Sequence, residues 1–153
     1  EAICEENRRR YGTEGAQKSG GLAAGLYDDR THFIFELLQN AEDALGRRGD
    51  WQGPRKVAFA LAPTRLTLSH FGKTFDEADV RSVCDIAEST KNESSIGRFG
   101  LGFKSVYTVT ELPEIHSGEE NFAIENYVFP KRLARSVSIA GSAASTTACE
   151  STR

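Results

Sequence analysis

The chain of 153 residues contains no methionine, only three cysteines and no long apolar run. Because methionine is missing, we expect the chain to be a fragment of a longer protein. Cys4, Cys84 and Cys149 are odd in number and lack C-x-x-C spacing, which argues against a disulfide framework or a zinc site and favours a reducing compartment, cytoplasmic or nuclear. No segment approaches the roughly 18 apolar residues of a membrane span or has the pattern of a secretory signal, so we expect no membrane attachment.

An excess of positive charge is also missing, since 19 Lys and Arg stand against 22 Asp and Glu, for a net charge of -3. Proteins dedicated to nucleic acids usually concentrate basic residues on one face, so nucleic acid is not an expected partner. The short run Arg8–Arg10 follows Glu5 and Glu6, which favours a solvated helix face. The length and composition are those of one soluble globular domain.

The most distinctive segment is a loop in which Gly97, Gly100 and Gly102 fall within six residues. Glycine lets the backbone come close to a ligand, and successive free N–H groups leading into a helix suit phosphate. The P-loop spacing is not met, because Phe103 adds a residue before Lys104, and the dinucleotide fingerprint fails as well. From the loop alone, a phosphate-binding loop and a structural glycine-rich turn both remain open.

The best-defined element is an amphipathic helix that starts after the capping residues 27–31 and ends near Gly46. Glu36, Asn40, Asp43 and Arg47 form a stripe beside its apolar face, with i, i+4, i+7, i+11 spacing. One interpretation is a solvent-facing edge. The other is a pocket in which a carboxylate deprotonates a water and an amide oxygen binds Mg²⁺. The apolar residues of this helix are Ile34, Leu37, Leu38, Ala41, Ala44 and Leu45.

The two ends of the chain differ from its middle. Residues 1–26 are charged and then rich in glycine, which disfavours a long helix and predicts a mobile strap. Residues 136–153 are dominated by Ser, Ala and Thr, without periodicity or aromatic residues. Such a segment buries too little apolar surface to offset its ordering entropy, so we expect a tail that is disordered or foreign to the domain.

Between the ends, alternating apolar residues predict an antiparallel hairpin, followed by a turn that contains Gly72. A helix with acidic residues in its first turn follows, then a polar lid before the glycine loop. Further strands and turns complete the domain. The ranges are 56–61 and 65–70 for the hairpin, 76–87 for the helix, 88–95 for the lid, 106–110 and 122–129 for strands, and Pro113 and Ser117–Gly118 for turns.

In order, the chain thus has a helix with E-x-x-x-N-x-x-D, a hairpin with a glycine turn, a polar lid and G-x-x-G-x-G-F. This combination resembles the GHKL superfamily of ATPases, which includes gyrase B, the ninety-kilodalton heat-shock chaperone, histidine kinases and MutL. Residues 36–44 resemble the N-box of that family and residues 96–107 its glycine box. The same segments are similar to the ATP-binding domain of sacsin-like proteins, and the resemblance covers roughly residues 20–130.

The resemblance implies an α+β fold, the two-layer α/β sandwich called the Bergerat fold, over residues 27–135. Its sheet is mixed and mostly antiparallel, with helices on one face, and here it would be incomplete at the C-terminus. The implied cofactors are ATP and Mg²⁺, with slow Mg²⁺-dependent ATP hydrolysis serving a larger chaperone-like or defence protein and its further domains or clients. The alternative is a catalytically inactive nucleotide-binding or protein-interaction module of the same fold.

The resemblance also implies residue roles. Glu36 would be the general base for the hydrolytic water, and Asn40 would be the Mg²⁺ ligand. Lys104 would add charge near the phosphates, or would be a surface residue. The implied nucleotide-binding residues come from the helix, turn, lid and loop, and they are Asp43, Gly72, Thr90, Lys91, Gly97, Gly100, Gly102, Phe103 and Lys104.

One position departs from the family pattern where the base would bind. The family usually reads adenine with an Asp two residues before the turn glycine, whereas this chain has His70 there and Phe71 in the next position. Neutral His can accept one hydrogen bond and charged His cannot. The sequence therefore does not predict selection for adenine.

Overall fold

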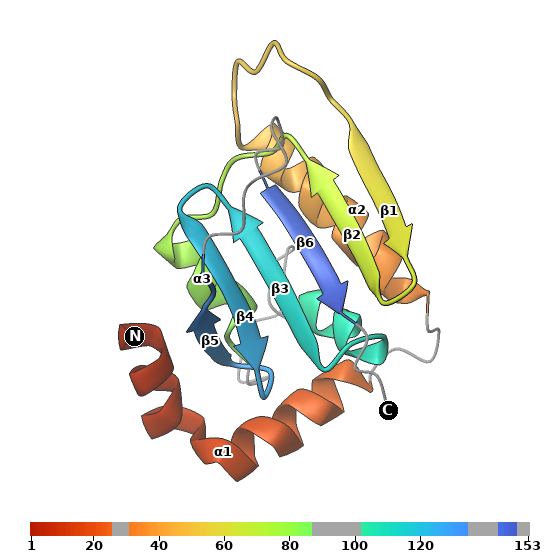
Figure 1. Ribbon diagram of the computed structural model, residues 1–153. Helices are drawn as coiled ribbons and strands as arrows, with labels where there is room; N and C mark the ends of the chain where they lie inside the picture. Colours follow the sequence, from red (N-terminus) through yellow and green to blue (C-terminus); the bar gives the residue numbers. More distant parts are fainter. Residues whose placement is uncertain (26–30, 87–101, 135–143, 150–153) are drawn as a thin grey trace, which may run out of the picture.

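The structure, a computed structural model, describes residues 1–25, 31–86, 102–134 and 144–149 (Figure 1). It is an α+β fold in which a six-stranded sheet carries helices on one face, as the two-layer sandwich predicted from the sequence requires. The elements are α1 (Ala2–Ala24), α2 (His32–Gly46), β1 (Val57–Ala62), β2 (Arg65–His70), α3 (Glu77–Val83), the 3₁₀ helix η1 (Lys104–Thr108), β3 (Leu112–Ser117), β4 (Glu120–Glu125), β5 (Phe129–Arg132) and β6 (Ala144–Cys149).

The sheet has the strand order β1-β2-β6-β3-β4-β5, and each of these described neighbours pairs antiparallel. The predicted hairpin is confirmed, with Val57 opposite His70 and Ala62 opposite Arg65. The turn predicted at Ser117–Gly118 is also confirmed and joins β3 to β4. Gly118 has a positive φ of 62°, a conformation that favours glycine.

The helix α2 forms where its amphipathic pattern predicts it. Phe33, Leu37, Ala41 and Ala44 are buried, and they recur at helical spacing on the face toward the sheet. The helix α3 begins with a capping box, in which the side chain of Asp76 accepts from the Asp79 amide and Asp79 accepts from the Asp76 amide. The described α3 ends at Val83, earlier than the predicted end at residue 87.

The main hydrophobic core lies between the sheet and the helices α2, α3 and η1. Burying this apolar surface is the main favourable term that holds the two layers together. The buried residues of this core are Phe33, Leu37, Ala41, Leu68, Val80, Val83, Cys84, Phe103, Val106, Ile115, Phe122 and Ile124.

The strap predicted over residues 1–26 is helical in the structure up to Ala24, and that prediction is wrong for α1. The helix changes direction at Gly12, whose φ of 60° and ψ of 173° are not helical. Ala16 is fully buried in a second small cluster with Ile86, Val128 and Phe129. Packing of α1 against the domain therefore outweighs the low helix propensity of its glycines.

Three other local predictions are wrong. The segment 106–110 belongs largely to η1 and is not a strand, because Val106 turns into the core after Phe103. Pro113 lies within β3 rather than in a turn. The strand predicted over 122–129 is divided between β4 and β5 by a turn in which Asn126 and Tyr127 have positive φ.

The tail predicted over residues 136–153 to be disordered or foreign to the domain contains β6, which lies between β2 and β3 in the middle of the sheet. Residues 144–149 are thus paired in the sheet and not disordered, because backbone hydrogen bonds on both sides satisfy a segment with few apolar side chains. Within the described ranges, no helix is long and apolar enough to cross a membrane.

Candidate functional site

The proposed catalytic carboxylate of Glu36 lies against Gly102, the last glycine of the loop. A Cβ atom placed on Gly102 would stand 1.9 Å from Glu36 Oε2 and 2.7 Å from its carboxyl carbon. Any side chain at position 102 would therefore displace the carboxylate. The helix stripe and the end of the glycine loop, far apart in the sequence, meet at this contact.

Glu36 has a second contact within its own helix. His32 Nε2 lies 2.9 Å from Glu36 Oε1, one turn earlier on α2. The side chains are about one-third and one-fifth exposed. This hydrogen bond orients one carboxylate oxygen and leaves Oε2 on the side of Gly102.

A small cavity lies between α2, β2 and α3, with Phe103 as part of its wall. Its volume of about 30 Å³ is room for one or two waters. A nucleotide base would require the lining side chains to move apart. The lining residues are Leu37, Asn40, Ala44, Arg47, Leu68, His70, Phe75, Asp79, Val83 and Phe103.

The turn that carries Gly72 is docked on the C-terminal part of α2. The Lys73 amide donates to the Ala44 carbonyl at 2.8 Å. A Cβ on Gly72 would lie 2.5 Å from Ala44 Cβ and 2.9 Å from the Ala44 carbonyl carbon, so this close approach requires glycine. On the outer side, Arg48 donates to the Phe71 carbonyl. Its guanidinium lies 3.5 Å from the ring centroid of Trp51.

His70 is buried where β2 enters this turn. Its Nδ1 accepts a hydrogen bond from the Gly72 amide at 3.1 Å. Burial lowers the pKa of His70, so the neutral ring is favoured near neutral pH. The unusual His therefore stabilises the turn through Nδ1 and also lines the cavity.

One side of the cavity is closed by an ion pair between α2 and α3. Arg47 Nη1 lies 2.6 Å from Asp79 Oδ1, and Asp79 Oδ2 also accepts from the Asp76 amide at 3.1 Å. Both oxygens of the Asp79 carboxylate are thus engaged by described groups.

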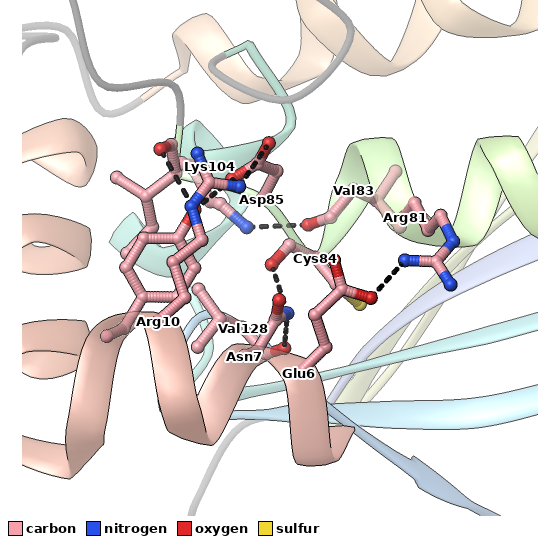
Figure 2. A network of polar contacts seen from close by, with 11 residues as sticks. Glu6, Asn7, Arg10, Arg81, Val83, Cys84, Asp85, Lys104 and Val128 are labelled. Atoms are coloured by element: carbon pink, nitrogen blue, oxygen red, sulfur yellow. Dashed lines mark hydrogen bonds and ion pairs between the residues drawn. The ribbon is translucent and has the colours of Figure 1, made fainter. Parts of the chain in front are cut away.

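Lys104 points into the protein, where its ammonium reaches the Val83 carbonyl (Figure 2). Its side chain is fully buried, and Nζ donates to the carbonyls of Val83 and Tyr127, each at 2.6 Å. The surface alternative for Lys104 is wrong, and its ammonium is committed to two main-chain acceptors. Burial lowers the pKa of Lys104 to about 8.

Asn7 completes the same buried region from α1. Its Nδ2 donates to the carbonyls of Cys84 and Val128, at 3.0 and 2.8 Å. Ion pairs of Arg81 with Glu6 and of Arg10 with Asp85 lie around it. We call the bonds of Lys104 and Asn7 to these four carbonyls the carbonyl network.

The predicted site residues therefore separate into groups. Asn40 and Phe103 line the cavity, while Glu36 contacts Gly102 and Gly72 packs on α2. Asp43 is exposed and is not among the lining residues. Thr90, Lys91, Gly97 and Gly100 lie outside the described residues. Within the described ranges, no group of three or more His, Cys, Asp or Glu could hold a metal ion.

Sequence reasoning did not assign Phe75, Asp79 or His32 to the site. Asp79 was recognisable only as an acidic residue of the first turn of a helix, and its ion pair with Arg47 depends on how α3 packs against α2. His32 had a local signal, because it precedes Glu36 by four residues on the same helix.

Comparisons with known proteins match the chain to sacsin-like proteins and to a bacterial chaperone. A family model described as "Sacsin domain" matches residues 67–134. The protein NO VEIN of Arabidopsis thaliana is 37% identical over 106 residues, covering 68% of this chain and 4% of that protein. Human sacsin is 31% identical over 113 residues, covering 61% of this chain and 2% of sacsin.

A bacterial chaperone gives a longer match. The chaperone protein HtpG of Aliarcobacter butzleri is 27% identical over 144 residues, covering 74% of this chain and 23% of HtpG. The chain thus spans less than a quarter of each of these three relatives. Together these matches support a relationship of the chain to a family of sacsin-like and HtpG-related proteins.

Proposed function

We propose that the chain is an ATP-binding domain of GHKL type that hydrolyses ATP slowly in a Mg²⁺-dependent reaction, as part of a larger chaperone-like or defence protein. The observation that carries this proposal is the approach of the Glu36 carboxylate to Gly102. The matches to sacsin and to the chaperone protein HtpG support it. The free thiols of Cys4 and Cys84 are consistent with the reducing compartment, cytoplasmic or nuclear, that we propose.

In the proposed reaction, Glu36 acts as the general base. Its Oε1 is held by His32, which leaves Oε2 available to orient a water and accept its proton. General-base catalysis of this kind contributes about 10²- to 10⁴-fold to a rate. Gly102 is needed because the absence of a side chain lets the carboxylate stand at the end of the glycine loop.

The residues present fit a magnesium ion that is held mainly by the phosphates of a bound nucleotide and by waters. Mg²⁺ usually takes one or two protein oxygens and completes its shell with waters and phosphate oxygens. Asn40 lies one turn after Glu36 and lines the cavity, so its amide oxygen would supply the protein ligand. The ion would supply charge stabilisation for the phosphates.

Calorimetric titration of the chain with ATP or ADP and Mg²⁺ tests the proposal. We expect Glu36→Ala to lower steady-state turnover at least about 100-fold with little change in nucleotide affinity. We expect Asn40→Ala to lose the Mg²⁺-dependent part of the affinity. Glu42→Ala is a matched control, because Glu42 is an exposed carboxylate of the same helix. No binding of either nucleotide at millimolar concentration would overturn the proposal.

A catalytically inactive module of the same fold is the second candidate function. The observation that favours it is the small cavity, together with a buried His70 where the family carries a carboxylate. A steady-state ATPase signal that disappears in Glu36→Ala would exclude this candidate. Nucleotide binding without any such signal would favour it.

A further inference from the structure

The edge of the sheet at β1 is uncovered in the part of the chain that the structure describes. β1, yellow in Figure 1, is the first strand in the sheet order and pairs there with β2 alone. All six of its residues are exposed. None of them is charged, whereas edge strands usually carry charges or proline that prevent pairing with another chain. This edge is therefore open to a further strand.

The large apolar side chains of β1 share one face of the sheet. Val57, Phe59 and Leu61 alternate along the strand and are 40%, 42% and 84% exposed. Phe59 lies opposite Leu68, which is buried in the main core, so these side chains point to the face that carries the helices. We call the three side chains the β1 strip. An apolar strip that runs along an unpaired edge indicates an interaction surface.

The order of side chains in β1 is symmetric about Phe59. In either direction along the strand, Phe59 is followed by an alanine and then by a larger apolar residue, Val57 or Leu61. An antiparallel copy centred on this position would place Phe59 opposite itself and Val57 opposite Leu61. The large side chains would meet on one face and the alanines on the other. A twofold interface requires this kind of self-complementary surface.

The charges that flank β1 favour the antiparallel direction. Arg55 and Lys56 precede the strand, and no acidic residue lies between them and Thr64. In the antiparallel pairing these two basic residues would lie opposite Pro63 and Ala62 of the second copy, at opposite ends of the joined strands. A parallel pairing would bring the basic residues of the two copies side by side, which is destabilising. The flanking charges thus suit a second copy in the antiparallel direction.

We propose that the chain forms a twofold homodimer in which β1 pairs antiparallel with β1 of a second copy, with Phe59 at the axis. The two sheets become one continuous sheet, and each β1 strip packs against the other. Because one pair of short strands buries less surface than a standard interface, we expect a weak dimer with a Kd of about 1–100 µM. The pairing needs no nucleotide, so its tests are independent of the proposed function.

Sedimentation equilibrium of the full chain without nucleotide, from about 1 to about 300 µM, measures the association around the expected Kd. We expect a monomer–dimer equilibrium. Phe59→Lys should weaken it at least about tenfold, because it removes the central apolar pair and sets two ammonium groups opposite each other. Leu112→Lys is the matched control, since Leu112 is 39% exposed on β3, inside the sheet order and not at the β1 edge.

Three outcomes of this experiment would overturn the proposal. A chain that stays monomeric over the whole range would exclude a second copy as the occupant of the edge. Association that Phe59→Lys leaves unchanged, or that Leu112→Lys weakens as much, would place the contact elsewhere. Species larger than a dimer would contradict a closed twofold pairing.

Cross-linking tests the register and does not depend on the lysine variant. In the proposed pairing the two copies of position 59 have Cβ atoms about 4.5–5.5 Å apart, within reach of a disulfide after a small shift. We expect Phe59→Cys, oxidised with diamide, to form more covalent dimer than the wild type, whose three cysteines set the background. Leu61→Cys alone should stay at that background, whereas its mixture with Val57→Cys should exceed it. Equal cross-linking of Phe59→Cys and Leu61→Cys would overturn the pairing.

Discussion

Gly102 and Lys104 are two residues apart, yet they belong to regions of opposite character. At Gly102 the carboxylate of Glu36, whose side chain is about one-fifth exposed, occupies the space that a side chain at position 102 would fill. At Lys104 a fully buried ammonium and the nearby Asn7 amide satisfy four main-chain carbonyls from separate parts of the chain. The contact of Glu36 with Gly102 depends on the absence of a side chain at position 102. The contacts of Lys104 and Asn7 are buried hydrogen bonds, whose loss is costly.

This difference suggests a division of roles. The carbonyl network joins α1, the end of α3 and the β4–β5 turn around the start of η1, as Figure 2 shows. Because η1 begins at Lys104, two residues after Gly102, the network anchors the chain that follows the glycine. We expect substitutions in the network to change mainly the free energy of unfolding, and substitutions at Gly102 to change mainly turnover.

The largest effect is expected for Lys104→Met, which keeps most of the side-chain volume but removes both hydrogen bonds. It leaves the Val83 and Tyr127 carbonyls buried without this donor, and we expect the free energy of unfolding to fall by about 3 kcal/mol. Urea titration measures this change. Lys131→Met is the control, because Lys131 is exposed and paired with Glu125, and its loss should cost under about 1 kcal/mol. An equal loss in the free energy of unfolding for the two variants would contradict the stabilising role of the carbonyl network.

The burial of Lys104 should also appear in the pH dependence of stability. Its pKa falls from 10.5 in the unfolded chain to about 8 in the folded protein. Between these pH values the unfolded chain binds more protons, so this group alone makes stability rise with pH, by up to about 3 kcal/mol. Burial raises the pKa values of Cys84, to about 12, and of Tyr107, which acts in the opposite direction.

The difference between the wild type and Lys104→Met isolates this contribution. We expect the stability advantage of the wild type over the variant to grow between about pH 8 and pH 10.5 in urea titrations. A constant difference over that interval would show that Lys104 titrates as it does in the unfolded chain.

A smaller effect is expected for Asn7→Ala. The change removes two buried hydrogen bonds that hold α1 to the Cys84 and Val128 carbonyls, at a cost of about 2 kcal/mol. Gln17→Ala is the control on the same helix, because Gln17 makes an exposed bond to Asn126 and should cost under about 0.5 kcal/mol. Faster amide exchange across α1 in Asn7→Ala, measured by mass spectrometry, should accompany the loss. An unchanged rate of amide exchange in Asn7→Ala would show that the carbonyl network does not hold α1 to the domain.

The smallest change in stability, under about 1 kcal/mol, is expected for Gly102→Ala, since the end of a flexible Glu side chain can move. If the proposed function holds, turnover should nevertheless fall at least about tenfold, because Glu36 loses its position. Gly46→Ala is the control, as a Cβ there meets nothing within 4 Å. A Gly102→Ala variant with normal turnover would remove the functional meaning of this contact.

Local signals account for the elements that the sequence predicted well. The apolar spacing of α2, the alternation in β1 and β2 and the acidic start of α3 each lie within a few neighbouring residues. The same holds for the stripe of Glu36 and Asn40, because positions four apart share a helix face whatever the rest of the chain does.

Elements that depend on distant partners were missed. The Ser- and Thr-rich β6 becomes a strand because β2 and β3 offer it backbone partners on both sides. The glycine-rich α1 stays helical because Ala16 and Asn7 are buried against distant segments. In η1, the burial of Val106 outweighs the strand propensity of its sequence.

The sequence by itself determined that a carboxylate and an amide share one face of α2 and that glycines crowd one loop, because residue type and helical period are local properties. Tertiary structure alone decided that Glu36 meets Gly102, that Lys104 turns inward to main-chain carbonyls, and that His70 accepts through Nδ1. These three contacts depend on which distant groups the fold brings together and on which buried polar atoms must then form hydrogen bonds. Neighbouring residues in the sequence specify neither condition.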